Sequence, residues 1–235
     1  MYQKLAKYYD LIYHGKDYQK ESNSIKEIIK KYRKSAGNLL LDVGCGTGKH
    51  IEQFKEDFSC TGIDINNEMV EVASENVKGV IFDQGDMIDF NLKKEFDVIL
   101  CLFSAIGYVK TYSNLEKTIL NFSNHLKKGG VLVIEPWLTK SVWRAGEPGM
   151  TTYDGKDVKI ARVNNTKIEG DLSIMDMHYL IAEKNADVIY YVDTHELGLF
   201  EIDRTLEFMD IAGLQSEFLE DGLMGDRGLY IGVKL

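Results

Sequence analysis

The stretch LLDVGCGTGKH, residues 40–50, places a glycine-rich turn directly after an apolar run. The run, residues 38–43, is continuous rather than alternating, which is typical of a strand buried on both faces of a sheet. Glycines let the backbone approach a ligand where side chains would clash, and a following helix points its free N–H groups at that ligand. The stretch therefore predicts a strand, a ligand-binding loop and a helix, in that order.

The spacing of the loop separates two classes of ligand. Dinucleotide-binding folds use G-x-G-x-x-G, with an acidic residue about 20 positions further on for the ribose. The motif here, formed by Gly44, Gly46 and Gly48, is G-x-G-x-G, which is one residue shorter. Asp42 precedes the turn, where a carboxylate is a poor neighbour for a pyrophosphate and a good one for an ammonium group. Asp64 ends the second predicted strand, where it can accept both ribose hydroxyls.

Asp86 and Met87 follow the third predicted strand. A carboxylate there can accept the adenine amino group, while the thioether side chain covers the ring. A ligand that carries an ammonium group, a ribose and an adenine along its length is S-adenosyl-L-methionine rather than NAD. Two alternatives stay open, a NAD-binding domain and a protein that holds S-adenosylmethionine without turnover, because a strand-end Asp is also a common turn residue or helix cap.

Strand-like and helix-like segments alternate along the first 137 residues. Asn66 or Asn67 can cap the helix after the second strand, and Gly129-Gly130 is expected to close a helix that ends near Leu126. Strands that alternate with helices form βαβ units, so we predict the α/β class with a mostly parallel sheet. The strands are expected at residues 38–43, 59–65, 80–84, 96–103 and 131–135.

The pattern changes near Pro136. The chain's only two prolines, Pro136 and Pro148, bracket an irregular stretch. Residues 157–199 then resemble an antiparallel meander with turns at 169–171 and 183–185. Alternate residues are expected on one face of this meander: Met175, Met177, Tyr179 and Ile181.

The α/β pattern returns after the meander. A helix near residues 203–212 precedes a hairpin of residues 217–220 with 229–235. The chain is therefore expected to have a ligand-binding core with an N-terminal cap, an antiparallel insertion, and a helix and hairpin that complete the core sheet. The predicted bounds of these parts are 1–137, 138–200 and 201–235.

Composition excludes several classes of protein. Of 235 residues, 44% are hydrophobic and 28% charged, as in soluble globular proteins, and the longest apolar run (98–109) is interrupted by polar and glycine residues. The formal charge of −9 argues against a nucleic-acid binder, since no basic face is evident. The number of cysteines is odd (Cys45, Cys60 and Cys101), and the sequence starts without an apolar leader. Both features predict a reduced, cytoplasmic protein. No cysteine–histidine cluster suggests a metal.

Several motifs together resemble a known family. LDVGCGTGKH, GIDI and QGDM are similar to the class I S-adenosylmethionine-dependent methyltransferases over residues 38–135. A narrower resemblance, nearly end to end, is to the sugar N-methyltransferases that act on dTDP-linked deoxyamino sugars. It is carried by MYxxxAxxYDxxY, GKDY, CLFSAIGY, NFSNHLKKGG, VIEPW and DRGLYIGV. It implies a Rossmann-like core with a mostly parallel seven-stranded sheet, an antiparallel insertion at the sugar nucleotide, and S-adenosyl-L-methionine as cofactor.

The resemblance also implies a set of cofactor-binding residues. Tyr18 of GKDY falls near the methionyl carboxylate, and the backbone of Leu102, Phe103 and Ser104 lies along the methionyl portion. The full predicted set is Tyr18, Asp42, Gly44, Gly46, Asp64, Ile65, Met69, Asp86, Met87, Leu102, Phe103 and Ser104.

Tyr13 and His125 fall where the family presents side chains to the sugar amine, and both are the predicted catalytic residues. His125 is the candidate base, because a neutral imidazole accepts a proton near pH 7. Each has a plainer interpretation. Tyr13 could be ordinary packing in a tyrosine-rich helix, and His125 could be a solvated imidazole near a helix C-terminus.

The remaining predicted residues contact the substrate. Arg227, Arg162 and His178 are expected near the dTDP moiety, with Trp137 and Tyr13 beside them. His178 could instead be half-buried scaffold on a strand. The sequence leaves open the sugar, the position of its amine (C-3 or C-4), the number of methyls added and whether the protein is a homodimer. A different small-molecule amine or hydroxyl as acceptor is the alternative function.

Overall fold

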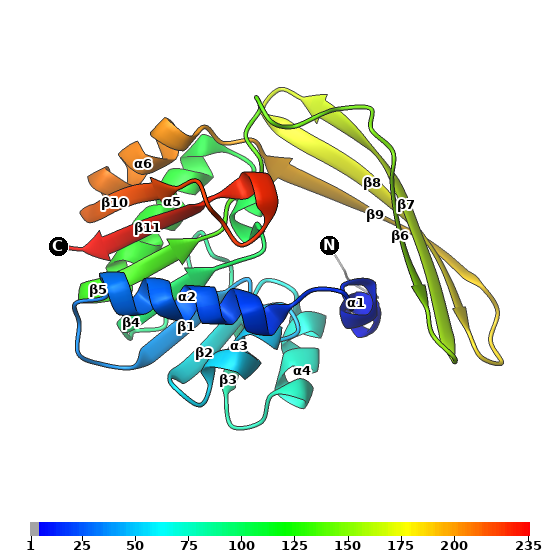
Figure 1. Ribbon diagram of the computed structural model, residues 1–235, viewed down its shortest axis with the longest axis horizontal. Helices are drawn as coiled ribbons and strands as arrows, with labels where there is room; N and C mark the ends of the chain where they lie inside the picture. Colours follow the sequence, from blue (N-terminus) through cyan, green and yellow to red (C-terminus); the bar gives the residue numbers. More distant parts are fainter. Residues whose placement is uncertain (1–4) are drawn as a thin grey trace.

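The computed structural model describes residues 5–235, which form two β-sheets (Figure 1). The larger sheet has seven strands in the order β10-β11-β5-β4-β1-β2-β3. Strands β1 to β5 pair in parallel, and β11 and β10 add to β5 as an antiparallel edge. The bounds are β1 (Leu39–Val43), β2 (Ser59–Asp64), β3 (Ile81–Gln84), β4 (Phe96–Cys101), β5 (Leu126–Ile134), β10 (Leu214–Leu219) and β11 (Leu229–Lys234).

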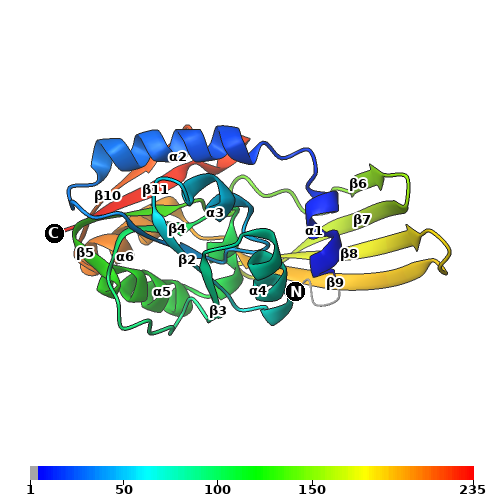
Figure 2. The same ribbon diagram turned by 90° about the horizontal axis from the view of Figure 1, so that it is seen from below.

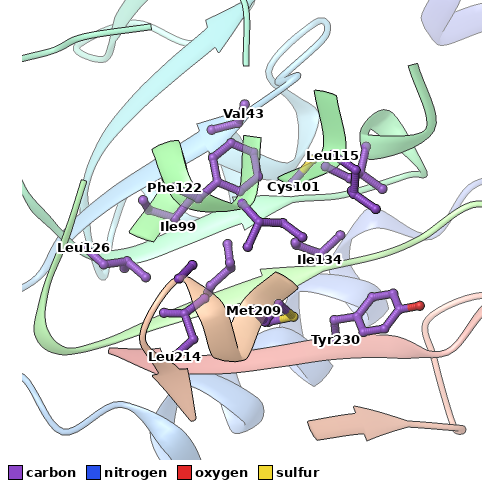
Figure 3. Packing of buried hydrophobic residues seen from close by; sticks show 14 of the residues in the cluster. Val43, Ile99, Cys101, Leu115, Phe122, Leu126, Ile134, Met209, Leu214 and Tyr230 are labelled. Carbon is purple, nitrogen blue, oxygen red and sulfur yellow. The ribbon is translucent and has the colours of Figure 1, made fainter. Parts of the chain in front are cut away.

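Helices cover both faces of this sheet because its strands are apolar on both sides. On one face, α2 (Tyr18–Tyr32), α3 (Lys49–Phe54) and α4 (Asn67–Asn76) share one buried apolar cluster with the strands. On the other, α5 (Tyr112–Asn124) and α6 (Ile202–Ile211) share a second cluster. Figure 3 shows this second cluster, where Phe122 and Leu115 of α5 and Met209 of α6 meet the side chains of Ile99 and Ile134.

The smaller sheet is antiparallel, in the order β6-β7-β8-β9. The short helix α1 (Ala6–Ile12) lies between the two sheets in both Figure 1 and Figure 2. Tyr8 and Ile12 of α1 pack against Met175 and Tyr179 on the inner face of β8. The strand bounds are β6 (Gly149–Asp154), β7 (Val158–Glu169), β8 (Leu172–Glu183) and β9 (Ile189–Gly198).

The predicted fold class is confirmed. The parallel strands form near their expected places, and the residues of β8 expected on one face are all buried. Asn66 is the helix cap, since its side chain accepts a hydrogen bond from the Glu68 N–H at 2.9 Å. The division into parts at 138 and 200 stays a prediction. Met1 and Tyr2 of the N-terminal motif lie outside the described residues.

Three local predictions are wrong. Gly129-Gly130 does not close a helix: α5 ends at Asn124, and the two glycines lie inside β5, where the pairing with β4 shifts register. Gly129 adopts φ +75° there, a conformation that glycine accepts without strain. Strand β6 (Gly149–Asp154) adds a strand before the meander that was expected to begin at residue 157, and β10 begins at Leu214 rather than Glu217.

Among the described residues no helix is long and apolar enough to cross a membrane. Within residues 5–235 no group of three or more His, Cys, Asp or Glu side chains is arranged to hold a metal ion. The three cysteines are buried and unpaired with one another.

Candidate active site

A cavity of about 1080 Å³ opens between the two sheets. Its floor is formed where β1, β2, β3 and β4 end, the edge at which open α/β sheets bind ligands. Its other walls come from α1, the segment leading into α2, and the inner face of the smaller sheet. The volume exceeds the roughly 300–1,000 Å³ of single-ligand pockets, so two ligands can lie in it side by side.

The glycine loop forms one end of this cavity. Gly44, Gly46 and Gly48 have φ of +73°, +52° and +80°, all in the left-handed region that glycine tolerates. A Cβ on Gly44 would lie 2.7 Å from the Cβ of Ala105, so the loop packs directly against the segment after β4. A Cβ on Gly46 would have no atom within 4 Å, so this part of the loop faces open space.

Asp64 ties the loop to the neighbouring strand. Its Oδ2 accepts a hydrogen bond from the Gly46 N–H at 2.9 Å, and its Oδ1 accepts one from the Asn66 N–H at 2.9 Å. Burial raises the pKa of this carboxyl, although these N–H donors act to lower it. Asp64 therefore organises the loop before any ligand arrives.

Asp42 lies behind the loop rather than on the cavity wall. Its side chain is buried, and none of residues 5–235 makes a hydrogen bond to its Oδ2. Burial, and then the negative charge of Asp64, raise the pKa of Asp42 to about 7. A positive group in the cavity would stabilise the ionised form of both acids.

Tyr18 also lies off the cavity wall. Its ring packs edge-on against His50, with the ring centroids 4.9 Å apart. Its neighbour in the GKDY motif, Lys16, lines the cavity instead and lies 4.2 Å from the centroid of the Phe103 ring. Lys16 forms a buried ion pair with Glu21, whose other oxygen lies 2.9 Å from Nε2 of His50. Sequence reasoning chose the tyrosine of the motif and missed the lysine.

The other predicted cofactor residues all line the cavity. Phe103 and Ser104 have φ of +51° and +63°, unusual for residues with side chains, and this turns the backbone after β4 along the wall. Asp86 accepts a hydrogen bond from the Ile88 N–H through Oδ1. The residues brought together are Gly44, Gly46, Asp64, Ile65, Met69, Asp86, Met87, Leu102, Phe103 and Ser104.

Two arginines approach the cavity from different elements. Arg227, at the end of a single 3₁₀ turn η2 (Gly225–Arg227), lies 4.6 Å from the Trp137 ring centroid and donates to Oγ of Ser104 at 2.9 Å. Arg162 of β7 donates to the hydroxyl of Tyr13 at 3.0 Å and to Oγ1 of Thr151 at 2.9 Å. Tyr13, Trp137, Arg162 and Arg227 all line the cavity, and their contact with a substrate stays a prediction.

The prediction that His125 is the catalytic base is contradicted by its position. His125 caps the end of α5, and its carbonyl accepts the N–H of Phe96, the first residue of β4. It therefore lies at the opposite edge of the sheet from the cavity. Both ring nitrogens are engaged, Nδ1 with the carbonyl of Asn121 at 2.9 Å and Nε2 with the N–H of Leu92 at 3.3 Å.

His178 is also misplaced by the sequence-based prediction. It projects from the outer face of β8, where its ring stacks on Tyr190 and its Nδ1 lies 2.6 Å from the Tyr190 hydroxyl. The strand alternation that placed Met177 and Tyr179 toward the cavity side turns His178 away from it.

A different histidine lines the cavity. His195 of β9 is buried beside Tyr108 of η1 (Ala105–Val109), the 3₁₀ helix after β4. The two residues lie 87 positions apart in the chain. No local sequence pattern could have predicted this contact, because the two residues meet only where the smaller sheet packs on η1.

Comparisons with known proteins agree with this architecture. A family model described as "Methyltransferase domain" matches residues 40–130. The dTDP-3-amino-3,4,6-trideoxy-alpha-D-glucopyranose N,N-dimethyltransferase of Streptomyces venezuelae is 36% identical and covers 97% of both chains. The dTDP-4-amino-2,3,4,6-tetradeoxy-D-glucose N,N-dimethyltransferase of Saccharopolyspora spinosa is 33% identical, over 97% of this chain and 92% of its own.

Solved structures agree in the same way. The crystal structure of Streptomyces venezuelae DesVI has a TM-score of 0.91 at 33% identity and covers 98% of both chains. SAM-bound CalS10, an amino pentose methyltransferase from Micromonospora echinaspora, has a TM-score of 0.84 at 29% identity, over 94% of this chain and 93% of its own. With this identity and coverage, the chain is an S-adenosylmethionine-dependent enzyme and belongs to the sugar N-methyltransferases of the class I methyltransferase fold.

Proposed function

We propose that this enzyme transfers two methyl groups from S-adenosylmethionine to the amino group of a dTDP-linked deoxyamino sugar. The observation that carries the proposal is one cavity lined by a glycine loop, by acids at strand ends and by two arginines from other elements, Arg227 and Arg162. The activities named for the relatives support the substrate class and the dimethylation, and their substrates include amines at C-3 and at C-4.

The residues at the loop end fit the cofactor. The open space beside Gly46 leaves room for the ligand to approach the backbone, and a cationic ligand would stabilise the ionised forms of the buried acids Asp42 and Asp64, whose pKa values burial raises. In this proposal Asp64 accepts the ribose hydroxyls, Asp86 and Met87 hold the adenine, and Lys16 attracts the methionyl carboxylate. Bound S-adenosylmethionine supplies an electrophilic methyl group on a positive sulfur.

The arginine side would hold the nucleotide sugar. A guanidinium makes two parallel charge-assisted hydrogen bonds to a phosphate, which suits a diphosphate link. Arg227 is held against Trp137 and Ser104, and Arg162 against Tyr13 and Thr151, so both groups are already oriented. With the diphosphate fixed, the sugar extends toward Tyr13 and the methyl donor.

In this proposal the protein contributes to the reaction mostly by positioning the two reactants. An amine attacks the methyl carbon in line with the departing sulfur, and holding two reactants in attack geometry can supply up to ~7–11 kcal/mol. The α1 helix and the smaller sheet close the cavity from the sides that the core leaves open, which limits competing attack by water.

Asp64→Ala is expected to weaken S-adenosylmethionine binding by about 10- to 150-fold. The change removes the hydrogen-bonding carboxylate, a total loss of about 1.5–3 kcal/mol, and frees the Gly46 end of the loop. Isothermal titration calorimetry measures the affinity. Asp83→Ala, which removes an exposed carboxylate from the adjacent strand β3, is the control. Unchanged affinity in a folded Asp64→Ala protein would remove Asp64 from the ribose role.

Mass spectrometry of reactions with a set of acceptors tests the substrate class. The set contains dTDP sugars with an amine at C-3, an amine at C-4 and a hydroxyl in place of the amine, together with simple amines without a nucleotide. We expect two added methyls on an amino sugar and none on the hydroxyl sugar. Transfer to a simple amine alone would favour the alternative acceptor, and cofactor binding with no transfer to any acceptor would favour a non-catalytic binding protein.

The outer face of the smaller sheet supports a homodimer as a further part of this proposal. Apolar side chains are exposed in neighbouring register positions across its four strands, on the face opposite the buried Met177 and Tyr179. They are Met150, Val163, Leu180, Tyr190 and Val192. Light scattering is expected to report twice the chain mass, and Leu180→Glu is expected to give the monomer. A monomeric parent protein contradicts the proposal.

A further inference from the structure

A row of three polar side chains is buried in the wall of the cavity. The Tyr108 hydroxyl lies 2.6 Å from Nδ1 of His195, and Nε2 of His195 lies 3.1 Å from Oδ2 of Asp193. His195 is 1% exposed and Asp193 6% exposed. Tyr108 and His195 both line the cavity, whereas Asp193 lies behind them.

The fold fixes this row from two directions. Asp193 and His195 are alternate residues of β9, so both point to the inner face of the smaller sheet. Tyr108 comes from η1, which packs closely on β9 through Gly107. A Cβ at Gly107 would lie 3.0 Å from Cδ2 of Leu197, so a larger residue would push Tyr108 away from His195.

The neighbours of His195 determine which of its nitrogens carries the proton. The Asp193 carboxylate lies at ion-pair distance from Nε2, although not in line for a well-aligned hydrogen bond, and its charge favours the tautomer with the proton on Nε2. Nδ1 is then the acceptor, and the Tyr108 hydroxyl donates to it. The oxygen of Tyr108 therefore has its lone pairs available on the cavity side.

We propose that Tyr108, His195 and Asp193 form a proton relay for the substrate amine. The inference rests on the proposed function. The Tyr108 oxygen accepts an N–H of the amine, which orients the nitrogen and leaves its remaining position toward the methyl donor. As the proton moves from the nitrogen to the Tyr108 oxygen, the proton of Tyr108 passes to Nδ1 of His195. The Asp193 carboxylate stabilises the resulting imidazolium.

The step balances in atoms and electrons. The N–H bond of the bound ammonium breaks and leaves its electron pair on nitrogen, which forms the new bond to the methyl carbon. The electrons of the carbon–sulfur bond go to sulfur, which becomes neutral. The relay holds one extra proton on His195 and returns it through Tyr108 to water after each transfer, when S-adenosylhomocysteine leaves, so that it can accept the proton of the secondary ammonium before the second transfer.

Dimethylation gives the relay a specific task. The first transfer leaves a secondary ammonium, which has no lone pair and cannot attack a second methyl group. In a cavity closed by α1 and the smaller sheet, that nitrogen has little access to bulk water. A built-in acceptor lets the ammonium lose its proton without leaving the site.

Tyr108 passes the proton on rather than keeping it. Burial, and then nearby charges, raise the pKa of Tyr108 well above its usual range, so the free enzyme holds no tyrosinate. Within the row, Nδ1 of His195 is the atom placed to receive this proton, 2.6 Å from the Tyr108 hydroxyl. The other titratable groups acting on Tyr108 are Tyr13 directly after α1, Tyr179 of β8, and Asp64 at the end of β2. Arg162 of β7 faces Tyr13.

The pH dependence of kcat tests the relay in Tyr108→Phe and His195→Gln. If the amine titrates near the ~8 of an α-amino group, about one tenth of it is neutral at pH 7. Without the relay only this fraction reacts, so we expect kcat to fall about tenfold at pH 7. The loss should shrink to less than about twofold above pH 9, while the parent enzyme stays nearly flat between pH 7 and 9.

His178→Gln provides a matched control. It changes the histidine of a tyrosine–histidine pair that has the same 2.6 Å separation on the outer face of the same sheet, and it is expected to leave the kcat profile unchanged. Tyr108→Phe removes one oxygen only, so it decides the outcome if His195→Gln does not fold.

The outcomes separate the two proposals. An unchanged kcat in Tyr108→Phe, or a loss that is equal at every pH, overturns the relay and leaves the proposed function in place. No methylation of any dTDP-amino sugar by the parent enzyme overturns the proposed function and the relay with it.

Discussion

Gly44→Ala is expected to lower the affinity for S-adenosylmethionine by about a hundredfold. Gly44 has φ +73°, where a side chain costs about 1–2 kcal/mol. Its new Cβ would also lie 2.7 Å from the Cβ of Ala105, and such overpacking costs about 1–3 kcal/mol. Ala105 cannot rotate its Cβ away, so the loop or η1 must shift. Both line the cofactor end of the cavity, and calorimetry with the purified variant measures the resulting loss of affinity.

Gly79→Ala separates backbone strain from the clash. Gly79 has φ +81°, yet a Cβ there would meet no atom within 4 Å, and the residue lies outside the cavity. The control should lose stability and keep its cofactor affinity. Equal affinities in the two variants would mean that the loop position does not determine cofactor binding.

Arg227→Ala is expected to raise the KM for the sugar nucleotide by about 10- to 150-fold with little change in kcat. Hydrogen bonds to a charged group contribute about 1.5–3 kcal/mol, and a contact to the diphosphate is made equally before and during methyl transfer. Steady-state kinetics measures both constants. Since Arg227 also donates to Ser104, calorimetry must show that cofactor affinity is retained.

Arg204→Ala is the control for charge. Arg204 pairs with Glu207 on α6 and lies outside the cavity, so its loss changes the net charge of the enzyme equally without touching the site. A fall in kcat at saturating substrate with KM unchanged would contradict the diphosphate role of Arg227.

Much of the core could be predicted from the sequence because its signals are local. The glycine loop, the acids at strand ends and the Asn66 cap each depend on a few consecutive residues and on the strand or helix beside them. The errors arose where a local signal had two meanings. Gly129-Gly130 resembles a helix end, but it allows a register shift inside β5.

The substrate side was harder to predict for a geometric reason. Its residues come from α1, β7, β9 and η1, and only the position of the smaller sheet relative to the core brings them together. The family resemblance predicted Tyr13, Arg162 and Arg227 as substrate-binding residues, and all three line this wall. It also predicted His125 as the base, but His125 lies at the opposite edge of the parallel sheet. Tyr108 ends the motif CLFSAIGY, but neither residue type nor spacing marked its contact with the distant His195.

The most direct test of the proposed activity is to determine which atom of the product carries the transferred methyl group. The enzyme is incubated with S-adenosylmethionine carrying a ¹³C methyl and with a dTDP-linked 3-amino or 4-amino sugar, and the product is examined by ¹³C NMR. We predict two equivalent labelled methyls bonded to the amine nitrogen, with S-adenosylhomocysteine formed in twofold amount. Label on a hydroxyl oxygen or a carbon, or no label on either sugar while the enzyme still binds the cofactor, would contradict the account.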